Sequence, residues 1–217
     1  MGFCLEVSGD YACFTRPEMK VERVSYDVMT PSAARAIYEA ILWKPAMQWH
    51  ITKIDVMQPI RWISLRRNEL GSVLSVNNIK KAMNGKGGVL ANYIEEDRQQ
   101  RAALFLRDVR YRIHASFSLT GKAGAEDNAG KFAEMFQRRA KKGQCVNQPY
   151  LGCREFACDF SLIDPKTDTG KAIDVNNDLG WMLYDMDYAK LSPLFFRATL
   201  THGEMHVPSK DSDEVRG

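Results

Sequence analysis

A strict alternation in the middle of the chain constrains the fold more than any other feature of the sequence. Apolar side chains occupy the odd positions from Val109 to Leu119, whereas the even positions hold Arg110, Arg112, His114 and two serines. A period of two is that of a β-strand with one buried face and one polar face. Because a slip of one residue would exchange the two faces, the pattern also fixes the register. The chain must therefore fold around a sheet with a basic, polar side.

One amphipathic helix is expected before this strand in the sequence, and a second one after it. Thr30-Pro31 supplies a cap and a proline at the first helical position, and the apolar spacing that follows predicts a helix that ends near Trp43. A second helix begins after Asp127 or Asn128 and stops at Gly143, a typical C-terminal residue. Each helix has one apolar stripe, so both are expected to pack on the apolar side of the sheet.

Three further segments alternate like strands, and the order of all these elements predicts the fold class. The strands cover residues 3–14, 47–57 and 150–163. Strand, helix, strand, insertion, strand, helix and strand is the order of an α+β, ferredoxin-like βαββαβ domain, here residues 1–163. In such a domain two helices cover one face of a four-stranded antiparallel sheet, and the other face is open for a ligand.

The rest of the chain divides into an insertion, a small subdomain and a tail. The polar, basic and glycine-rich stretch from about 66 to 100 is expected to be an insertion or a mobile flap. Short strand signals at 179–188, 194–200 and 204–208 predict a small antiparallel β subdomain over residues 164–208. The polar tail, residues 209–217, is expected to be disordered.

Composition excludes several classes of protein. Charge interrupts every apolar stretch within a few residues, which argues against a membrane span or a secretory signal. The five cysteines form no CxxC pair and the four histidines have no ligand spacing, so we expect no metal, no cofactor and no disulfide framework. Free cysteines without a signal sequence indicate the reducing cytoplasm. Nucleotide-binding glycine motifs and nucleophile elbows are also missing.

Positive charge is concentrated in three windows although the whole chain has a net charge of only +3. Residues 61–86, 98–112 and 131–143 together carry a net charge of +13, and the remaining residues carry −10. Such segregation is typical of a surface that binds a polyanion. The alternative is that each window is the solvated face of an ordinary element.

Lys131 is the most specific candidate for a phosphate contact. It lies in the first turn of the second helix, where free backbone N–H groups favour an anion. Because the two helices of a ferredoxin-like domain are antiparallel, the residues around Lys44 are expected beside Lys131, with Tyr38 and His50 near the same edge. The alternatives are a surface lysine, a core tyrosine and a histidine on the sheet surface.

Several segments together resemble a known family, the CRISPR-associated Cas-five proteins of subtype I-C (the d-type) in the RAMP superfamily. The resemblance covers nearly the whole chain. It is carried, in order, by Gly9-Asp10-Tyr11-Ala12, Phe14-Thr15, Ala40-Ile41-Leu42-Trp43-Lys44-Pro45, Pro59-Ile60, Leu106-Arg107-Asp108-Val109-Arg110-Tyr111, Gly130-Lys131, Tyr150-Leu151-Gly152-Cys153-Arg154-Glu155 and Asp178-Leu179-Gly180.

The resemblance implies a metal-independent endoribonuclease that cuts the repeat hairpin of precursor CRISPR RNA and stays with the guide RNA in a Cascade-type complex. The implied chemistry is attack of a ribose 2′-OH on the adjacent phosphate, which gives a cyclic phosphate and a 5′-OH. In the family a tyrosine before Trp-Lys-Pro and a Gly-Lys-His sequence carry it. Here only Lys131 matches, because Leu42 and Phe132 occupy the other two positions.

Tyr38 and His50 are the predicted replacements for proton transfer, and Tyr26 and His114 are further candidates. The predicted RNA contacts are the basic side chains of the three windows and their neighbours: Lys44, Arg66, Arg67, Arg107, Arg110, Arg112, His114, Arg138, Arg139, Lys141, Lys142 and Arg154. The expected partners are precursor and mature guide RNA and the backbone and large subunits of a subtype I-C Cascade complex.

Two other functions remain open. Loss of both proton-transfer residues favours a scaffold subunit that binds the 5′ handle of the guide RNA and cuts weakly or not at all. The long basic insertion favours nonspecific binding of duplex DNA, whose affinity would fall steeply with salt. Selective binding of a repeat hairpin would argue against the second, because RNA is read through exposed bases and 2′-OH groups.

Overall fold

The computed structural model describes residues 2–164 and 170–217, and it confirms a mixed α and β fold with antiparallel sheets. Its elements, in chain order, are β1 (Gly2–Ala12), α1 (Pro31–Ile41), β2 (Met47–Val56), β3 (Trp62–Leu70), α2 (Val76–Met83), β4 (Arg98–Leu119), α3 (Ala129–Lys141), β5 (Asp159–Leu162), β6 (Asn177–Asp187), β7 (Ser192–Leu200) and β8 (Glu204–His206). No helix in these two ranges is long and apolar enough to cross a membrane.

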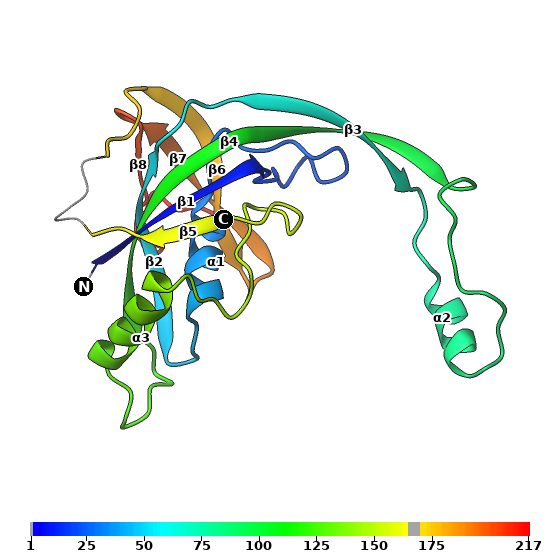
Figure 1. Ribbon diagram of the computed structural model, residues 1–217, viewed down its shortest axis with the longest axis horizontal. Helices are drawn as coiled ribbons and strands as arrows, with labels where there is room; N and C mark the ends of the chain where they lie inside the picture. Colours follow the sequence, from blue (N-terminus) through cyan, green and yellow to red (C-terminus); the bar gives the residue numbers. More distant parts are fainter. Residues whose placement is uncertain (1, 165–169) are drawn as a thin grey trace.

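The main sheet has the strand order β5-β1-β4-β2-β8, and every neighbouring pair in it is antiparallel. Side chains alternate between the two faces of the sheet, as expected. In β2, Trp49 and Ile51 are buried, while His50 and Thr52 are exposed. α1 and α3 pack on the buried side (Figure 1). The opposite side is the open face, and the central strands β4 and β1 supply most of its polar residues.

Both packed helices begin at the predicted caps. The Thr30 hydroxyl accepts a hydrogen bond from the Ala33 N–H at 3.3 Å, and Pro31 is the first residue of α1. The Asn128 side chain accepts from the Lys131 N–H at 2.8 Å and so starts α3. These bonds satisfy N–H groups that have no partner inside a helix.

An aromatic cluster joins the helices to the sheet. The rings of Tyr38 from α1 and Phe136 from α3 are 4.8 Å from the Trp49 ring of β2, and Phe3 and Phe117 lie on the same ring at 5.7 and 5.2 Å. All belong to the main hydrophobic core or pack against it. The Trp49 indole N–H also donates to the Leu42 carbonyl at 2.8 Å, which ties the end of α1 to β2.

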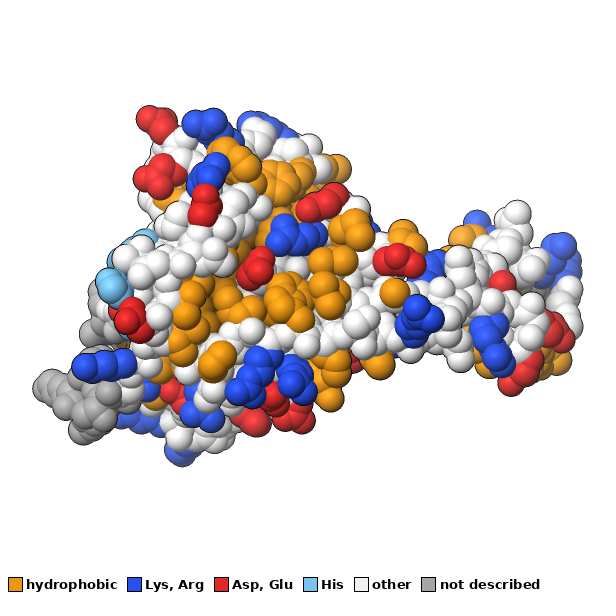
Figure 2. All heavy atoms as spheres, turned by 90° about the horizontal axis from the view of Figure 1, so that it is seen from above, with side chains coloured by type: hydrophobic (Ala, Val, Ile, Leu, Met, Phe, Trp, Pro, Cys, Tyr) orange, Lys and Arg blue, Asp and Glu red, His pale blue; other side chains and the backbone are white. Residues whose placement is uncertain are grey.

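The expected flap is a long β-hairpin arm. β3 pairs with the first half of β4 in continuous register from Trp62 opposite Leu106 to Leu70 opposite Arg98, and α2 lies at the tip (Figure 1). Strand pairing therefore replaces the predicted mobile loop at both ends of 66–100, and α2 lies between them. The arm projects far from the body and carries Lys and Arg side chains (Figure 2). None of residues 76–83 is buried, so the tip is held only through the hairpin.

The C-terminal strands divide between two sheets, unlike the single subdomain expected. β6 and β7 form a two-stranded sheet of their own, whereas β8 joins the main sheet beside β2, with His206 opposite Lys53. The tail is also ordered, contrary to expectation: Arg216 and Phe195 exchange two backbone hydrogen bonds of 2.7 and 2.8 Å. Residues 165–169, near the predicted start of the subdomain, lie outside the described residues.

Candidate functional site

The open face carries a row of polar side chains along β4, which we call the polar row. Its members are Arg110, Arg112, His114, Ser116 and Ser118. Neighbours in such a row are roughly 6.6 Å apart, because a strand rises about 3.3 Å per residue. In the flanking strands Glu6 of β1 lies opposite Arg112, and Lys53 of β2 lies opposite His114. The row is thus bordered by side chains of both charges.

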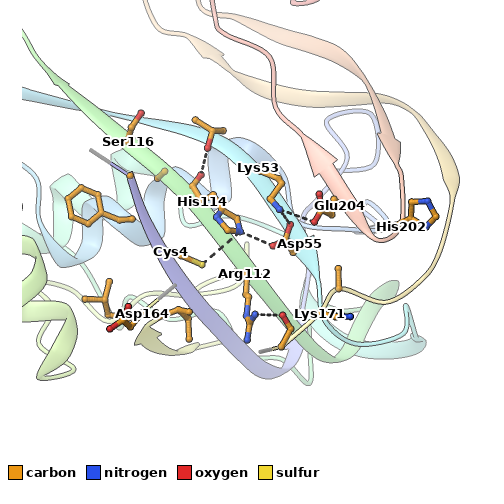
Figure 3. A pocket seen from close by; sticks show the side chains of 18 of the residues that line it. Cys4, Lys53, Asp55, Arg112, His114, Ser116, Asp164, Lys171, His202 and Glu204 are labelled. Atoms are coloured by element: carbon orange, nitrogen blue, oxygen red, sulfur yellow. Dashed lines mark hydrogen bonds and ion pairs between the residues drawn. The ribbon is translucent and has the colours of Figure 1, made fainter. Parts of the chain in front are cut away.

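His114 is the centre of a hydrogen-bonded network on this face (Figure 3). Its Nε2 atom is 2.7 Å from Oδ2 of Asp55 and 3.9 Å from Sγ of Cys4. These two bonds raise the pKa of His114 to about 9, although burial opposes them. Burial alone would raise the pKa of Asp55, but His114 and Lys53 hold it below its usual range. Lys53 also lies 3.0 Å from Glu204, so the network reaches β8.

The free energy of unfolding is expected to depend on pH through His114. Its folded pKa of about 9 exceeds the unfolded value of about 6.5, so the network stabilises the fold fully below pH 6.5 and loses this contribution as the pH rises through 9. Because a third of the side chain is exposed, we expect about 1–2 kcal/mol. Urea unfolding of the wild type and His114→Asn should show a difference that shrinks between pH 6.5 and 9.5; a constant difference would contradict this.

The two arginines predicted as an equivalent pair differ in the structure. Arg112 has only 9% of its side chain exposed, and its guanidinium donates to Glu6 at 3.0 Å and to the Gly170 carbonyl at 2.8 Å. Arg110 is 48% exposed and lies 3.9 Å from the same Glu6 carboxylate. Both arginines lie on the predicted polar face, but the 170–174 segment and β1 enclose Arg112, so Arg110 is the more exposed of the two.

A pocket of about 1110 Å³ lies over the middle of the polar row, at Arg112, His114 and Ser116 (Figure 3). Its wall is formed by strands β1, β2, β4, β5 and β8, helix α3, residues 163–164 and the segment 170–174. Positive charge comes from Lys53, Arg112, Lys141 and Lys171, and negative charge comes from Asp55, Asp164, Asp174 and Glu204. This mixture suits a ligand that is anionic and also offers hydrogen-bond donors, as a ribose phosphate does.

The structure places Tyr38 in the core, so its predicted role in proton transfer is corrected. Its side chain is fully buried, and its hydroxyl donates to the Ile113 carbonyl at 2.7 Å, with the Phe3 carbonyl at 3.3 Å. Burial holds the pKa of this phenol well above its usual range. Tyr26 is buried as well. Neither hydroxyl is open to a ribose in solution.

Tyr38→Phe is expected to lower the free energy of unfolding by about 1–2 kcal/mol, because two carbonyl oxygens lose a buried donor. Any ribonuclease activity should stay within twofold of the wild type at a temperature where both are folded. Urea unfolding and cleavage under single-turnover conditions measure the two effects. A hundredfold loss of cleavage without a matching loss of stability would restore Tyr38 as a catalytic candidate.

His50 and Lys131 lie on opposite sides of the main sheet. His50 is exposed on the open face, where its Nε2 atom is 2.7 Å from the Ser118 hydroxyl. Lys131 is exposed at the start of α3, on the other side of the sheet, and its Nζ lies 3.5 Å from the Glu126 carbonyl and 3.9 Å from Asp127. The predicted group of Lys131, Tyr38 and His50 is thus not brought together.

The last turn of α3, rather than its first, reaches the end of α1. Arg139 donates to the Ile41 carbonyl at 2.8 Å, where a cation also complements the helix dipole. The backbone just after α3 follows the same path, because the Val146 N–H donates to the Ala40 carbonyl. The expectation that Lys131 would be the neighbour of the α1 end is therefore corrected, and the predicted RNA contact at Arg139 is a helix cap.

Most of the other predicted RNA contacts are exposed, and they lie on several surfaces. Arg67 is the exception, since it pairs with Glu155 at 2.7 Å and covers the Phe105 ring. The exposed ones are Lys44, Arg66, Arg107, Arg138, Lys141, Lys142 and Arg154. Arg66 lies on the arm, and Arg138, Lys141 and Lys142 lie at the end of α3. A ligand that touched all of them would have to wrap around the body.

Sequence reasoning missed Lys53, Asp55 and Glu204. A bulge in β2 between Ile51 and Lys53 shifts the register against β4, so Ile51 and Ile54 both face the core. Asp55 consequently joins the polar side beside His114. An acidic residue between Ile54 and Val56, at the apolar end of the strand, was the available signal, because a buried carboxylate requires a charged partner.

Comparisons with known proteins agree with this fold. The Cas5d family model, described as CRISPR-associated protein (Cas_Cas5), matches residues 2–208. The chain belongs to the Cas5d family. The CRISPR pre-crRNA endoribonuclease Cas5d of Mannheimia succiniciproducens is 53% identical over 219 residues, which cover 98% of this chain and 97% of that protein. The protein of the same name from Thermus thermophilus is 38% identical, with 97% and 93% covered.

A solved structure, reported as the crystal structure of a CRISPR-associated protein, shares the fold at a TM-score of 0.72 and 23% identity. The match covers 100% of this chain and 97% of the chain in that structure.

Within the Cas5d family, this chain departs from the expected pattern at two positions in its core. Leu42 is fully buried and Phe132 nearly so, which leaves Lys131 as the exposed member of the three positions. The two positions that the resemblance assigns to proton transfer thus hold apolar, buried side chains.

Proposed function

We propose that this protein is an endoribonuclease that processes precursor CRISPR RNA by cutting within the repeat. The observation that carries the proposal is the 53% identity, over nearly the whole of both chains, to a protein named CRISPR pre-crRNA endoribonuclease. In the proposed reaction a ribose 2′-oxygen attacks the adjacent phosphorus without a metal ion, and the products are a cyclic phosphate and a 5′-OH. The product RNA then stays bound as guide RNA.

We infer that the body is a ferredoxin-like domain over residues 1–163 into which the arm is inserted, followed by a small β region over 164–208. The strand order β5-β1-β4-β2 with two helices on one face supports this assignment. In this proposal the open face binds RNA, with Arg110 and His50 among the contacts. Lys131 binds a phosphate elsewhere along the RNA, at the start of α3.

The exposed basic side chains on the arm and on α3 support an RNA that extends around the body. The proposed partners beyond RNA are the backbone and large subunits of a subtype I-C Cascade complex, with duplex DNA as a further polyanion. The same proposal places the protein in the cytoplasm, the compartment predicted from its cysteine usage.

A second function is a scaffold that binds the 5′ handle of the guide RNA without cutting it. The burial of Leu42 and Phe132 favours it, because neither side chain can transfer a proton and neither is reached from solvent. Tight, salt-resistant binding of the repeat hairpin without product would support the scaffold. Affinity that ignores sequence and falls steeply with salt would indicate nonspecific duplex DNA binding.

Incubation of the protein with its end-labelled repeat RNA in EDTA tests the proposal. We expect one discrete product with a cyclic phosphate end, and no cleavage when the nucleotide before the cut carries a 2′-deoxyribose. Lys131→Ala should weaken RNA binding or slow cleavage. Intact RNA at protein concentrations that bind it fully would reject the nuclease and leave the scaffold.

A further inference from the structure

We propose that the pocket over His114 holds the scissile phosphate and that His114 is the general acid which protonates the leaving 5′-oxygen. Asp55 is its positioning residue. The inference rests on the proposed endoribonuclease function and adds the place on the protein where the reaction occurs. It moves the chemistry from the helical side of the sheet, where the family pattern is incomplete, to the open face.

Solvent accessibility decides which of the candidate side chains can transfer a proton to a bound RNA. Of the tyrosines and histidines predicted for proton transfer, Tyr38 and Tyr26 are buried, so His50 and His114 remain on the open face. His50 is paired with a neutral hydroxyl, that of Ser118. His114 is paired with a carboxylate and lines the pocket. A histidine held by a carboxylate is the arrangement that fixes the orientation of an imidazole and stabilises its charged form.

The contacts of the imidazole leave one nitrogen for a substrate. Nε2 is taken by Asp55 at 2.7 Å and by Cys4 at 3.9 Å. Nδ1 therefore remains as the donor toward a bound ligand. Asp55 is itself fixed, because Lys53 lies 3.0 Å from its Oδ1 atom. The ring thus has a rigid support from two neighbouring strands and keeps a third of its side chain open to the pocket.

The cations of the pocket suit the charge that develops in this reaction. A phosphorane carries one more negative charge than the phosphodiester, and fixed cations near it lower the barrier. Lys53, Lys171 and the enclosed Arg112 line the same wall as His114 (Figure 3). The volume of about 1110 Å³ admits the reacting nucleotides together with solvent.

In the proposed step one bond from phosphorus to oxygen forms and another breaks. The 2′-oxygen forms a bond to phosphorus and its proton passes to a water molecule, while the bond from phosphorus to the 5′-oxygen breaks. The imidazolium of His114 gives its proton to that 5′-oxygen and becomes neutral. The products are a 2′,3′-cyclic phosphate and a 5′-OH, and His114 recovers its proton from solvent.

Charged side chains from several elements surround His114 or line the same pocket. They are Glu6 from β1, Lys53 and Asp55 from β2, Arg112 from β4, Lys141 from α3, Glu204 from β8, Asp164 after β5, and Lys171 and Asp174 from the 170–174 segment. Asp55 is the carboxylate in direct contact. Its removal should therefore disturb His114 more than removal of any other acid.

The test uses the full chain, repeat RNA and a second RNA in which sulfur replaces the 5′-bridging oxygen at the cut. A thiolate leaves without a proton, so loss of a general acid slows only the oxygen substrate. We expect His114→Asn to cut normal RNA about 10²- to 10⁴-fold more slowly than the wild type, and the sulfur RNA within about threefold of it. Asp55→Asn should show a smaller loss with the same rescue.

His206→Asn is the matched control, because it removes an exposed histidine of β8 from outside the pocket. It should cut both RNAs at the wild-type rate. If His114→Asn cuts normal RNA as fast as the wild type, or cuts both RNAs equally slowly, the assignment of His114 is overturned and the nuclease stands. If the wild type cuts neither RNA, the proposed function fails as well.

Discussion

Replacement of Trp49 by alanine is expected to lower the free energy of unfolding by about 4 kcal/mol. The side chain is 1% exposed and is the one onto which the rings from α1, α3, β1 and β4 all pack. Truncation would leave a cavity between both helices and the sheet, and the Leu42 carbonyl would lose its buried donor. Urea unfolding followed by tryptophan-independent circular dichroism measures the loss.

Trp43→Ala is the matched control, since Trp43 is 54% exposed just after α1. We expect a loss below about 1 kcal/mol there. Trp49→Phe should fall between the two, because it keeps most of the apolar volume and loses the hydrogen bond to Leu42. Equal losses for Trp43→Ala and Trp49→Ala would mean that this aromatic cluster does not hold the helices on the sheet.

Gly152→Ala is expected to lower the free energy of unfolding by about 3 kcal/mol or more, although it adds a single methyl group. Gly152 has a φ of +83°, a left-handed conformation that costs an L-residue about 1–2 kcal/mol. A Cβ atom there would also lie 2.1 Å from the Cys13 carbonyl oxygen, closer than atoms can approach. The backbone must therefore move, and the hydrogen bond from the Cys13 N–H to the Leu151 carbonyl goes with it.

Gly143→Ala separates the two causes. Gly143 has a similar φ of +63° but open space where a Cβ would be placed. Its substitution should cost only the conformational part, about 1–2 kcal/mol. Thermal and urea unfolding of both variants give the comparison. Equal losses in the free energy of unfolding for the two variants would contradict this. They would show that the loop around Gly152 moves without loss of stability and is not held tightly against the residues that follow β1.

Local signals in the sequence were sufficient for the central strand and for both helix starts. The alternation from Val109 to Leu119 depends on one strand with one buried face, and the caps at Thr30 and Asn128 are contacts within four residues. Such features need no knowledge of distant contacts. The comparisons likewise confirm the family, which depended on segments spread along nearly the whole chain.

Contacts between distant residues decided what the sequence could not predict. Residues 98–104 of β4 pair with β3 and none of them is buried, so this part of the strand lacks the one-sided burial that reveals a strand. The strand at 204–208 was predicted, but the place of β8 beside β2 in the main sheet follows from packing between distant residues. The burial of Tyr38 depends on rings from α3 and β2. The pairing of Asp55 with His114 depends on a bulge that reverses the alternation.

β4 has a consequence for how this protein opens. It is one strand of 22 residues with a contour of roughly 70 Å, yet none of residues 98–104 is buried, whereas most of residues 109–115 are. The rate of amide hydrogen exchange should therefore differ between two parts of this single strand. It should be fast from Arg98 to Leu104 and slow from Tyr111 to Phe117. The arm can then melt and reform as an independent unit while the strand that carries His114 stays folded.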